Sequence, residues 1–275
     1  MLRFLCFGII LLWANGIQGS FLNLPNLVRF INATKEESAK NDFELAKTYQ
    51  SFNQSSLEEL ISVIRPQYRI ITDFYKQHAE EARQIERHIR DEGRDSAEAF
   101  YIPENYFEAI INSLLAVSKG YEDVSRANQL YEQLLLAQRR NFKANAQGNF
   151  LLPISHIKAV SALNTYIERA LGSLSANYND LVIIFSTLTK ETQSNKYESD
   201  SYDLIRLVCK QNADLYKEMH NTLVRVTEVD SSFVAVKDGW VVLNAEKYLN
   251  SYGQSMSQFG DLFLKLAQFW QNLKL

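Results

Sequence analysis

The chain has 275 residues, of which 46% are hydrophobic and 22% are charged. These values are typical of a folded protein and exclude a disordered chain. The formal net charge of −3 excludes a bulk positive field that would hold nucleic acid or an anionic membrane. Only ten Gly and four Pro occur in the whole sequence, and this scarcity favours long, uninterrupted helices.

Residues 1–19 have the pattern of a secretory signal peptide. Arg3 supplies a positive start, residues 4–13 form an apolar run, and small residues follow up to Ser20. The apolar run is shorter than the about 20 residues that a membrane-spanning helix needs. We therefore expect a signal peptide that is removed, followed by a single secreted, extracellular domain over residues 20–275 without a stable membrane span.

If the chain is secreted, two sequons can be interpreted as glycosylation sites and the cysteines can be considered for disulfide formation. Asn32 (in Asn-Ala-Thr) and Asn53 (in Asn-Gln-Ser) are predicted glycosylation sites. Cys6 leaves with the signal peptide, so Cys209 is the only cysteine of the expected mature chain and no intramolecular disulfide can form. We expect Cys209 to be a small buried hydrophobe, in preference to an intermolecular disulfide or a catalytic thiol.

Two helices are expected in the first third of the mature chain. Apolar residues at helical spacing predict a modest helix over residues 36–52 and a long one over residues 56–92. Ser56 and Glu59 at the start of the second helix form a capping box. Its apolar seam consists of Leu57, Ile61, Ile64, Tyr68, Ile71, Tyr75, His78, Ala82, Ile85 and Ile89.

The most regular pattern predicts two central helices, over residues 103–147 and 153–194. Seam positions recur in alternating steps of three and four residues, which predicts coiled-coil-like packing. The link over residues 149–153 is short, and short links join antiparallel neighbours. The first seam consists of Phe107, Ile110, Leu114, Val117, Tyr121, Val124, Asn128, Tyr131, Leu135, Gln138 and Phe142. The second consists of Ile157, Val160, Asn164, Ile167, Leu171, Leu174, Tyr178, Leu181, Phe185, Leu188 and Thr192.

After a polar turn over residues 195–201, further helices are expected over residues 201–230 and 245–273. Between them, residues 232–244 break the helical pattern with β-branched and aromatic residues on both sides of Asp238–Gly239. An Asp-Gly pair in this setting is a hairpin signal. A small β-hairpin is one interpretation, and the other is that two helix ends meet at Gly239.

Polar residues in the seams are the first candidate sites. His78 is interpreted as a neutral, hydrogen-bonded core residue, with a pH-sensing role as the alternative. Asn128 and Asn164 are interpreted as polar contacts that fix the register of the helices. No histidine has a Glu three residues before it, as carboxylate metal sites in helix bundles require, and zinc and nucleophile motifs are missing from the sequence. We therefore expect no enzyme, no cofactor and no metal.

Arg83, Arg87, Arg90 and Arg94 form a row on one face of the helix expected over residues 56–92. Acidic residues at neighbouring positions can pair with them. The row is interpreted as a solvated ladder of ion pairs, or as a binding site for an anionic partner such as a sulfated glycan.

The sequence thus predicts an all-α fold, an elongated antiparallel bundle of long amphipathic helices with a possible small β-hairpin near residues 232–244. The predicted function is that of a secreted, non-enzymatic, effector-like glycoprotein that binds a protein or glycan partner. The alternatives are a helical membrane-active or pore-forming protein and an extracellular carrier of an apolar ligand. The partner and the oligomeric state are left open.

Overall fold

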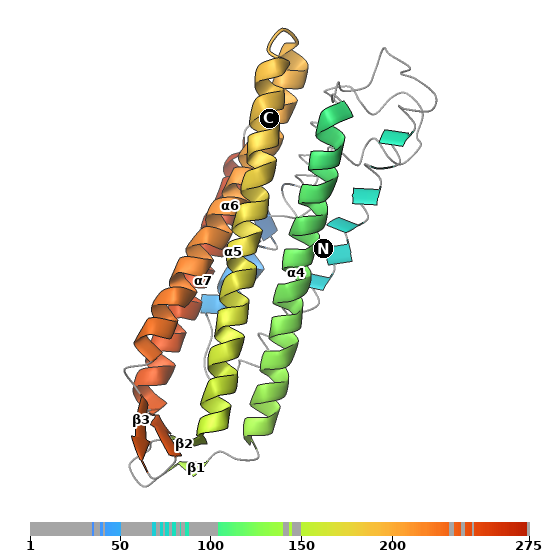
Figure 1. The fold of residues 1–275 in the computed structure, drawn as a ribbon. Coiled ribbons are helices and arrows are strands. Elements are labelled where there is room, and N and C mark those ends of the chain that lie inside the picture. The colour runs from blue at the N-terminus through green and yellow to red at the C-terminus, as the bar shows by residue number, and fades with distance from the viewer. Residues whose placement is uncertain are drawn as a thin grey trace.

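The computed structural model describes four long helices that run along an elongated, antiparallel rod (Figure 1). They are α4 (Glu104–Arg139), α5 (Ile154–Glu191), α6 (Lys196–Asp230) and α7 (Ala245–Asn272). The all-α bundle predicted from the sequence is confirmed. The described residues are Lys35, 39–40, 42–50, 68–69, 72–73, 75–76, 79–80, 83, 86–87, 104–139, 143–144, 150–230, 234–237, 240–243 and 245–273.

The helix boundaries differ from the prediction at three places. α4 ends at Arg139, so the prediction of helix to residue 147 was wrong. Pro153 closes strand β2 (Phe150–Pro153), with φ −60° and ψ 143°, and α5 begins only at Ile154. α6 begins at Lys196, and the turn lies over residues 192–195. Residues 196–201 contain no Gly or Pro, so nothing in their sequence prevents the helix from starting before the predicted residue.

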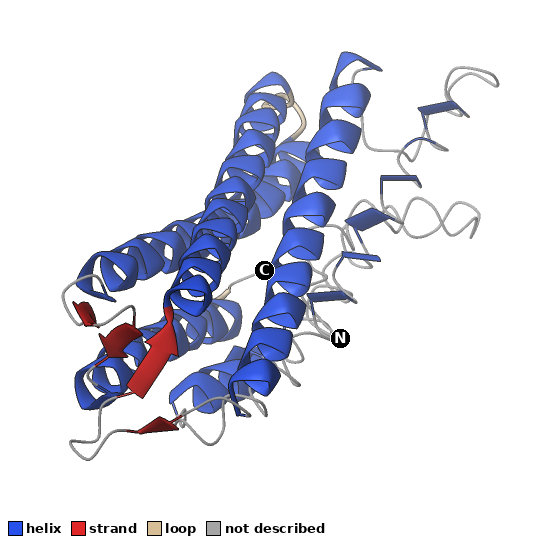
Figure 2. Ribbon diagram, turned by 60° about the horizontal axis from the view of Figure 1, so that its bottom comes forward, coloured by secondary structure: helices blue, strands red, loops and turns tan. Residues whose placement is uncertain are grey.

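A small antiparallel sheet lies at one end of the rod (Figure 2). Strands β3 (Val234–Lys237) and β4 (Trp240–Leu243) confirm the β-hairpin, and the alternative of two helix ends at Gly239 was wrong. The strand order is β1-β2-β4-β3, where β1 is Lys143–Ala144. The pairing of β2 with β4 joins the residues before α5 to those before α7. Because β2 pairs with a strand distant in the sequence, local patterns did not reveal it.

The described residues of 42–50 form the helix predicted over residues 36–52 and pack against α7. The ring of Tyr49 stacks on Phe263, with centroids 5.5 Å apart, and Trp270 Nε1 donates a hydrogen bond to Asp42 Oδ2 over 3.0 Å. A Cβ atom on Gly260 would lie 2.9 Å from the carbonyl oxygen of Ala46. Only glycine allows this close approach between the two helices.

The predicted seams form the core. The described part of the segment 68–87 is helical and lies beside α4 (Figure 1), while the capping box and the start of that helix lie outside the described residues. α5 lies between α4 and α6, and Cys209 on α6 is fully buried, as predicted. Buried seam residues of α4 and α5 are Ile110, Leu114, Val117, Tyr121, Val124, Leu171, Leu174, Tyr178, Leu181, Phe185 and Leu188.

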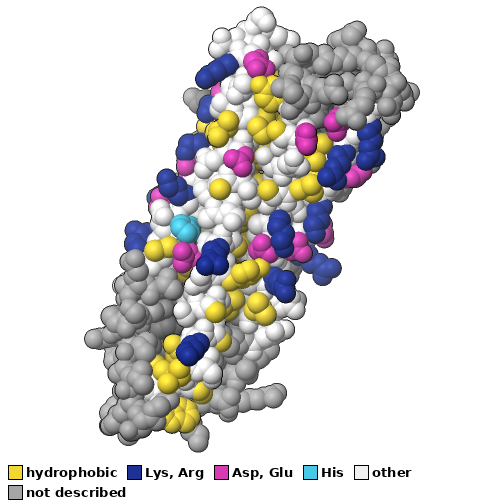
Figure 3. Space-filling model, in the orientation of Figure 1, with side chains coloured by type: hydrophobic (Ala, Val, Ile, Leu, Met, Phe, Trp, Pro, Cys, Tyr) yellow, Lys and Arg dark blue, Asp and Glu magenta, His cyan; other side chains and the backbone are white. Residues whose placement is uncertain are grey.

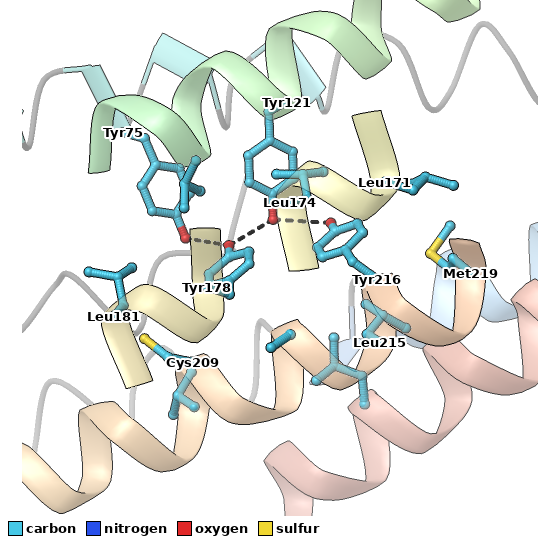
Figure 4. Close-up of a cluster of buried hydrophobic side chains, with 14 of the residues drawn as sticks. Tyr75, Tyr121, Leu171, Leu174, Tyr178, Leu181, Cys209, Leu215, Tyr216 and Met219 are labelled. Atoms are coloured by element: carbon cyan, nitrogen blue, oxygen red, sulfur yellow. Dashed lines mark hydrogen bonds between the residues drawn. The ribbon is translucent and has the colours of Figure 1, made fainter. Parts of the chain in front are cut away.

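Four tyrosine side chains meet at the centre of this core (Figure 4). The hydroxyl oxygen of Tyr178 on α5 lies 2.6 Å from that of Tyr75 and 2.8 Å from that of Tyr121 on α4. Tyr216 on α6 donates to Tyr121 over 3.0 Å. All four side chains are completely buried. We call Tyr75, Tyr121, Tyr178 and Tyr216 the tyrosine chain.

Contacts between the tyrosine rings and a hydrogen bond from a nearby serine add to the hydrogen bonds of the tyrosine chain. Tyr178 and Tyr216 stack with an interplanar angle of 3°, and Tyr121 meets Tyr178 edge-on at 85°. Ser175 on α5 donates to the carbonyl of Ala213 on α6 over 2.9 Å. Hydrogen bonds between buried groups are favourable only at one alignment of the helices, so these contacts fix the heights of α4, α5 and α6 relative to one another.

Removing the central hydroxyl should destabilise the fold. In Tyr178→Phe, the hydroxyls of Tyr75 and Tyr121 lose a partner inside the core, so we expect the free energy of unfolding to fall by about 1–3 kcal/mol. Tyr106→Phe, which removes an exposed hydroxyl bonded to Glu191, is the control and should cost no more than about 0.5 kcal/mol. Urea denaturation measures both, and equal losses would contradict a structural role for the chain.

Candidate functional site

Of the polar residues singled out in the seams, the structure describes Asn128 and Asn164. Asn128 Nδ2 donates to the carbonyl of Val124, one turn earlier in α4, over 2.9 Å. This bond lies within one helix, so it does not supply the expected contact between helices. Asn164 on α5 is buried. His78 lies outside the described residues.

In the described part of the chain, no group of three or more His, Cys, Asp or Glu residues could hold a metal ion. His220 on α6 has a structural contact, because its Nδ1 lies 3.0 Å from the carbonyl oxygen of Glu168 on α5. The imidazole packs over Gly172, where a Cβ atom would lie 3.4 Å from Nδ1. His220 therefore joins α5 to α6.

The arginine row is described in part. Arg83 Nη1 lies 3.6 Å from Glu80 Oε2, and the two side chains are 41% and 49% exposed, as expected for a solvated ion pair. Arg87 is also helical and exposed. Arg90 and Arg94 lie outside the described residues, as do the sequons at Asn32 and Asn53.

Neighbouring charges of opposite sign extend from this row onto α4. Lys76 Nζ lies 3.6 Å from Glu122, and Lys119 Nζ lies 3.8 Å from the same carboxylate. Cations and anions therefore alternate on this side of the rod. Mutual pairing of this kind lowers the local excess of positive charge that an anionic ligand would meet.

A polar clamp joins α4 to α5 next to this region. Tyr166 on α5 and Lys119 on α4 both donate to Asp123 Oδ1, each over 2.9 Å. Burial raises the pKa of the Tyr166 hydroxyl above its ordinary 10.0, and the bond to Asp123 raises it further. The bond to Asp123 also raises the pKa of Lys119, although partial burial opposes this.

The outward side of α5 has few charges. Between Arg169 and Lys190 the only charged residue is Asp180. Ile183 on this side is 65% exposed, which is unusual for a large hydrophobic residue. We call five positions on this side of the helix the α5 face, and they are Ser173, Ala176, Asp180, Ile183 and Thr187.

Figure 3 shows hydrophobic side chains along the middle of the rod, with Lys, Arg, Asp and Glu more numerous along its sides. The α5 face was not predicted from the sequence, because only the buried seam through Leu181 and Phe185 was considered for this helix. The apolar run of residues 181–185 was the available signal. Five consecutive apolar residues are more than one side of a helix can bury.

A second exposed apolar surface lies at the sheet end of the rod. Trp240 on β4 is 51% exposed, and its cross-strand partner Pro153 is also exposed. Ile154, the first residue of α5, is 38% exposed and follows directly. No helix among the described residues is both long and apolar enough to cross a membrane.

Comparison with known proteins yields no relative: no family model, no curated protein and no solved structure matches the chain. A functional proposal therefore depends on the surfaces described above.

The clamp at Tyr166 predicts a pH dependence of stability. The folded state holds the Tyr166 proton more tightly than the unfolded state, so the free energy of unfolding should fall as the pH rises above 10.0. Tyr166→Phe removes this ionisation, and its stability should fall less steeply than that of the wild type. Thr165→Ala, at the neighbouring position, is the control. Urea denaturation at a series of alkaline pH values measures the slopes, and identical slopes would refute the shift.

Proposed function

We propose that the protein is a secreted, non-enzymatic, effector-like interaction protein that binds a protein or glycan partner through the α5 face. The observation that carries the proposal is the exposure of Ile183 on a helix side with few charges. Depletion of charge around an exposed apolar residue is typical of the centre of a protein interface.

The size of the surface supports the same function. α5 contains 38 residues and is therefore about 57 Å long. It lies between α4 and α6, and packed helices are about 8–10 Å apart. The side of the rod centred on α5 thus offers about 1,000 Å² or more, above the roughly 800 Å² that each partner buries in a standard protein interface.

A charged residue in the middle of the α5 face should abolish partner binding. The full chain is expressed with its own leader in eukaryotic cells, recovered from the medium, immobilised, and exposed to extracellular fluid and to a glycan array. We expect Ile183→Asp to lower binding of whatever the wild type retains by about tenfold or more, the scale of a hot-spot residue.

The matched control is Leu130→Asp, which changes a 44% exposed apolar residue on α4 and should bind like the wild type. Equal binding by Ile183→Asp and the wild type would exclude the α5 face as the site. Failure to find the chain in the medium would contradict secretion.

Retention on heparin tests whether the partner is a sulfated glycan that binds to the arginine row. If the row binds a sulfated glycan, the wild type should be retained on heparin in a salt-dependent way, because each arginine displaces counterions from the polyanion. Replacing Arg83, Arg87, Arg90 and Arg94 by Ala should then remove retention. A wild type that passes through the column without salt-dependent retention would leave the row as a solvated ladder of ion pairs.

A membrane-active protein is the second candidate, favoured by the apolar hairpin of β3 and β4 at the end of the rod. Each strand has four residues and is about 13 Å long, whereas a membrane-spanning strand needs about 9–11 residues. The dimensions of the hairpin therefore support contact with a membrane more than formation of a pore.

The carrier alternative requires a cavity for an apolar ligand. At the level of Tyr178, packed tyrosine and leucine side chains occupy the space between α4, α5 and α6 (Figure 4). This part of the core offers no support for a carrier.

A further inference from the structure

We infer that the outer face of the sheet is a docking surface for a lipid bilayer. Successive residues of a strand point to opposite faces of the sheet, and cross-strand partners lie on the same face. The register of the strands therefore assigns each residue to one face. Leu152 and Val241 are cross-strand partners and are buried, at 5% and 2% exposed, so they mark the inner face. The next partners along each strand mark the opposite face.

On β2 and β4 that outer face is apolar and open to solvent, and the register places Lys143 of β1 beside Leu151 and Lys237 of β3 beside Trp240. Trp240 pairs with Pro153, and both are exposed. Val242 pairs with Leu151, and both are half-buried. We call Leu151, Pro153, Trp240 and Val242 the tip face. A surface strand normally has polar residues on its solvent side, so four apolar residues here need a further explanation.

The charge around the tip face suits a membrane surface. The four strands contain two lysines, Lys143 and Lys237, and no acidic residue. The stretch 133–167, which supplies β1 and β2, contains four Lys or Arg and no Asp or Glu, although the whole chain has a net charge of −3. Asp238 in the hairpin turn is the nearest acidic residue in the sequence to Trp240. Basic residues beside apolar and aromatic ones are the composition of interfacial membrane anchors.

The small area of the tip face and its position at one end of the rod favour a lipid bilayer over a protein as the partner. Four strands of at most four residues give a face of at most about 250 Å². This is about a third of what each partner buries in a stable protein interface, so a second copy of the chain has too little area to bind there. A bilayer has no such requirement. The sheet lies at one end of the rod (Figures 1 and 2).

Tryptophan is well suited to this position, because its ring prefers the boundary between lipid headgroups and acyl chains. Docking would attach this end of the rod to the bilayer. The inference rests on the second candidate function, a membrane-active protein, and names the surface that makes the contact; it requires neither a partner on α5 nor a pore.

The test uses the full chain recovered from the medium and dye-loaded vesicles of phosphatidylcholine mixed with phosphatidylserine. We expect the wild type to float with the vesicles without releasing dye, and the emission of Trp240 to shift to shorter wavelength. Trp270 is buried, at 3% exposed, so the difference between wild type and Trp240→Phe isolates the signal of Trp240. Brominated phosphatidylcholine should quench that signal, and this measurement needs no loss-of-function variant.

Two serine variants locate the contact. Trp240→Ser should lower vesicle affinity by about tenfold, because burial of a large apolar side chain is worth at least that factor. Ile183→Ser, at an even more exposed apolar residue on the side of the rod, should bind vesicles like the wild type. Unchanged far-UV circular dichroism in both variants shows that the fold is intact.

Several results would overturn the docking surface. They are no flotation of the wild type, equal loss of flotation in the two serine variants, or absence of quenching by brominated lipid. Release of the dye on binding would also contradict it, since a face that rests at the interface does not open the bilayer. A dimer that Trp240→Ser dissociates, without vesicle binding, would assign the tip face to a second copy.

Discussion

Hydrogen bonds between buried phenolic hydroxyls set the arrangement of the whole bundle. Apolar seams alone allow neighbouring helices to slide by a turn at little cost, because leucine against leucine is similar at every level. The hydroxyl of Tyr178 lies within hydrogen-bond distance of Tyr75 and Tyr121, and that of Tyr121 also receives a bond from Tyr216. A slip of one turn would break these bonds between fully buried groups. The tyrosine chain therefore selects one alignment.

That alignment determines where the functional surfaces lie. α5 provides Tyr178 to the centre of the tyrosine chain and lies between α4 and α6. Its inner side is fixed by Leu174, Leu181 and Phe185, so Ile183 must face outward. At the end of the rod, α5 continues directly from β2, and α7 follows β4. The same alignment therefore brings β2 and β4 together and creates the tip face.

The sequence was sufficient for the helices but not for their contacts. Steps of three and four residues identified Tyr75, Tyr121 and Tyr178 as core residues, because helix periodicity is local information. Tyr216 was missed, since the apolar spacing in the helix expected over residues 201–230 is less regular than in the two central helices. No pattern could show that the hydroxyls meet, because periodicity gives the side of a helix and not its height relative to its neighbours. The same limit applied to β2, whose partner β4 is distant in the sequence.

The surfaces were harder to predict than the core for a related reason. A core residue is recognised in the sequence by its place in an apolar seam. Ile183 and Trp240 are distinguished only by their exposed fractions in the fold, 65% and 51%. Exposure depends on the packing of every other element. The Asp238–Gly239 turn did predict the hairpin, because turn chemistry is also local, but the exposure of one of its faces became evident only in the assembled fold.

If the tyrosine chain holds α4, α5 and α6 in one alignment, the middle of α5 should belong to the most stable part of the described bundle. Native-state hydrogen exchange followed by mass spectrometry tests this directly, since amides in the most stable unit exchange only through global unfolding. We predict that peptides covering residues 171–185 exchange more slowly than those from both ends of α5 and from residues 196–201 of α6. Exchange in the middle of α5 as fast as in residues 196–201 would contradict the account.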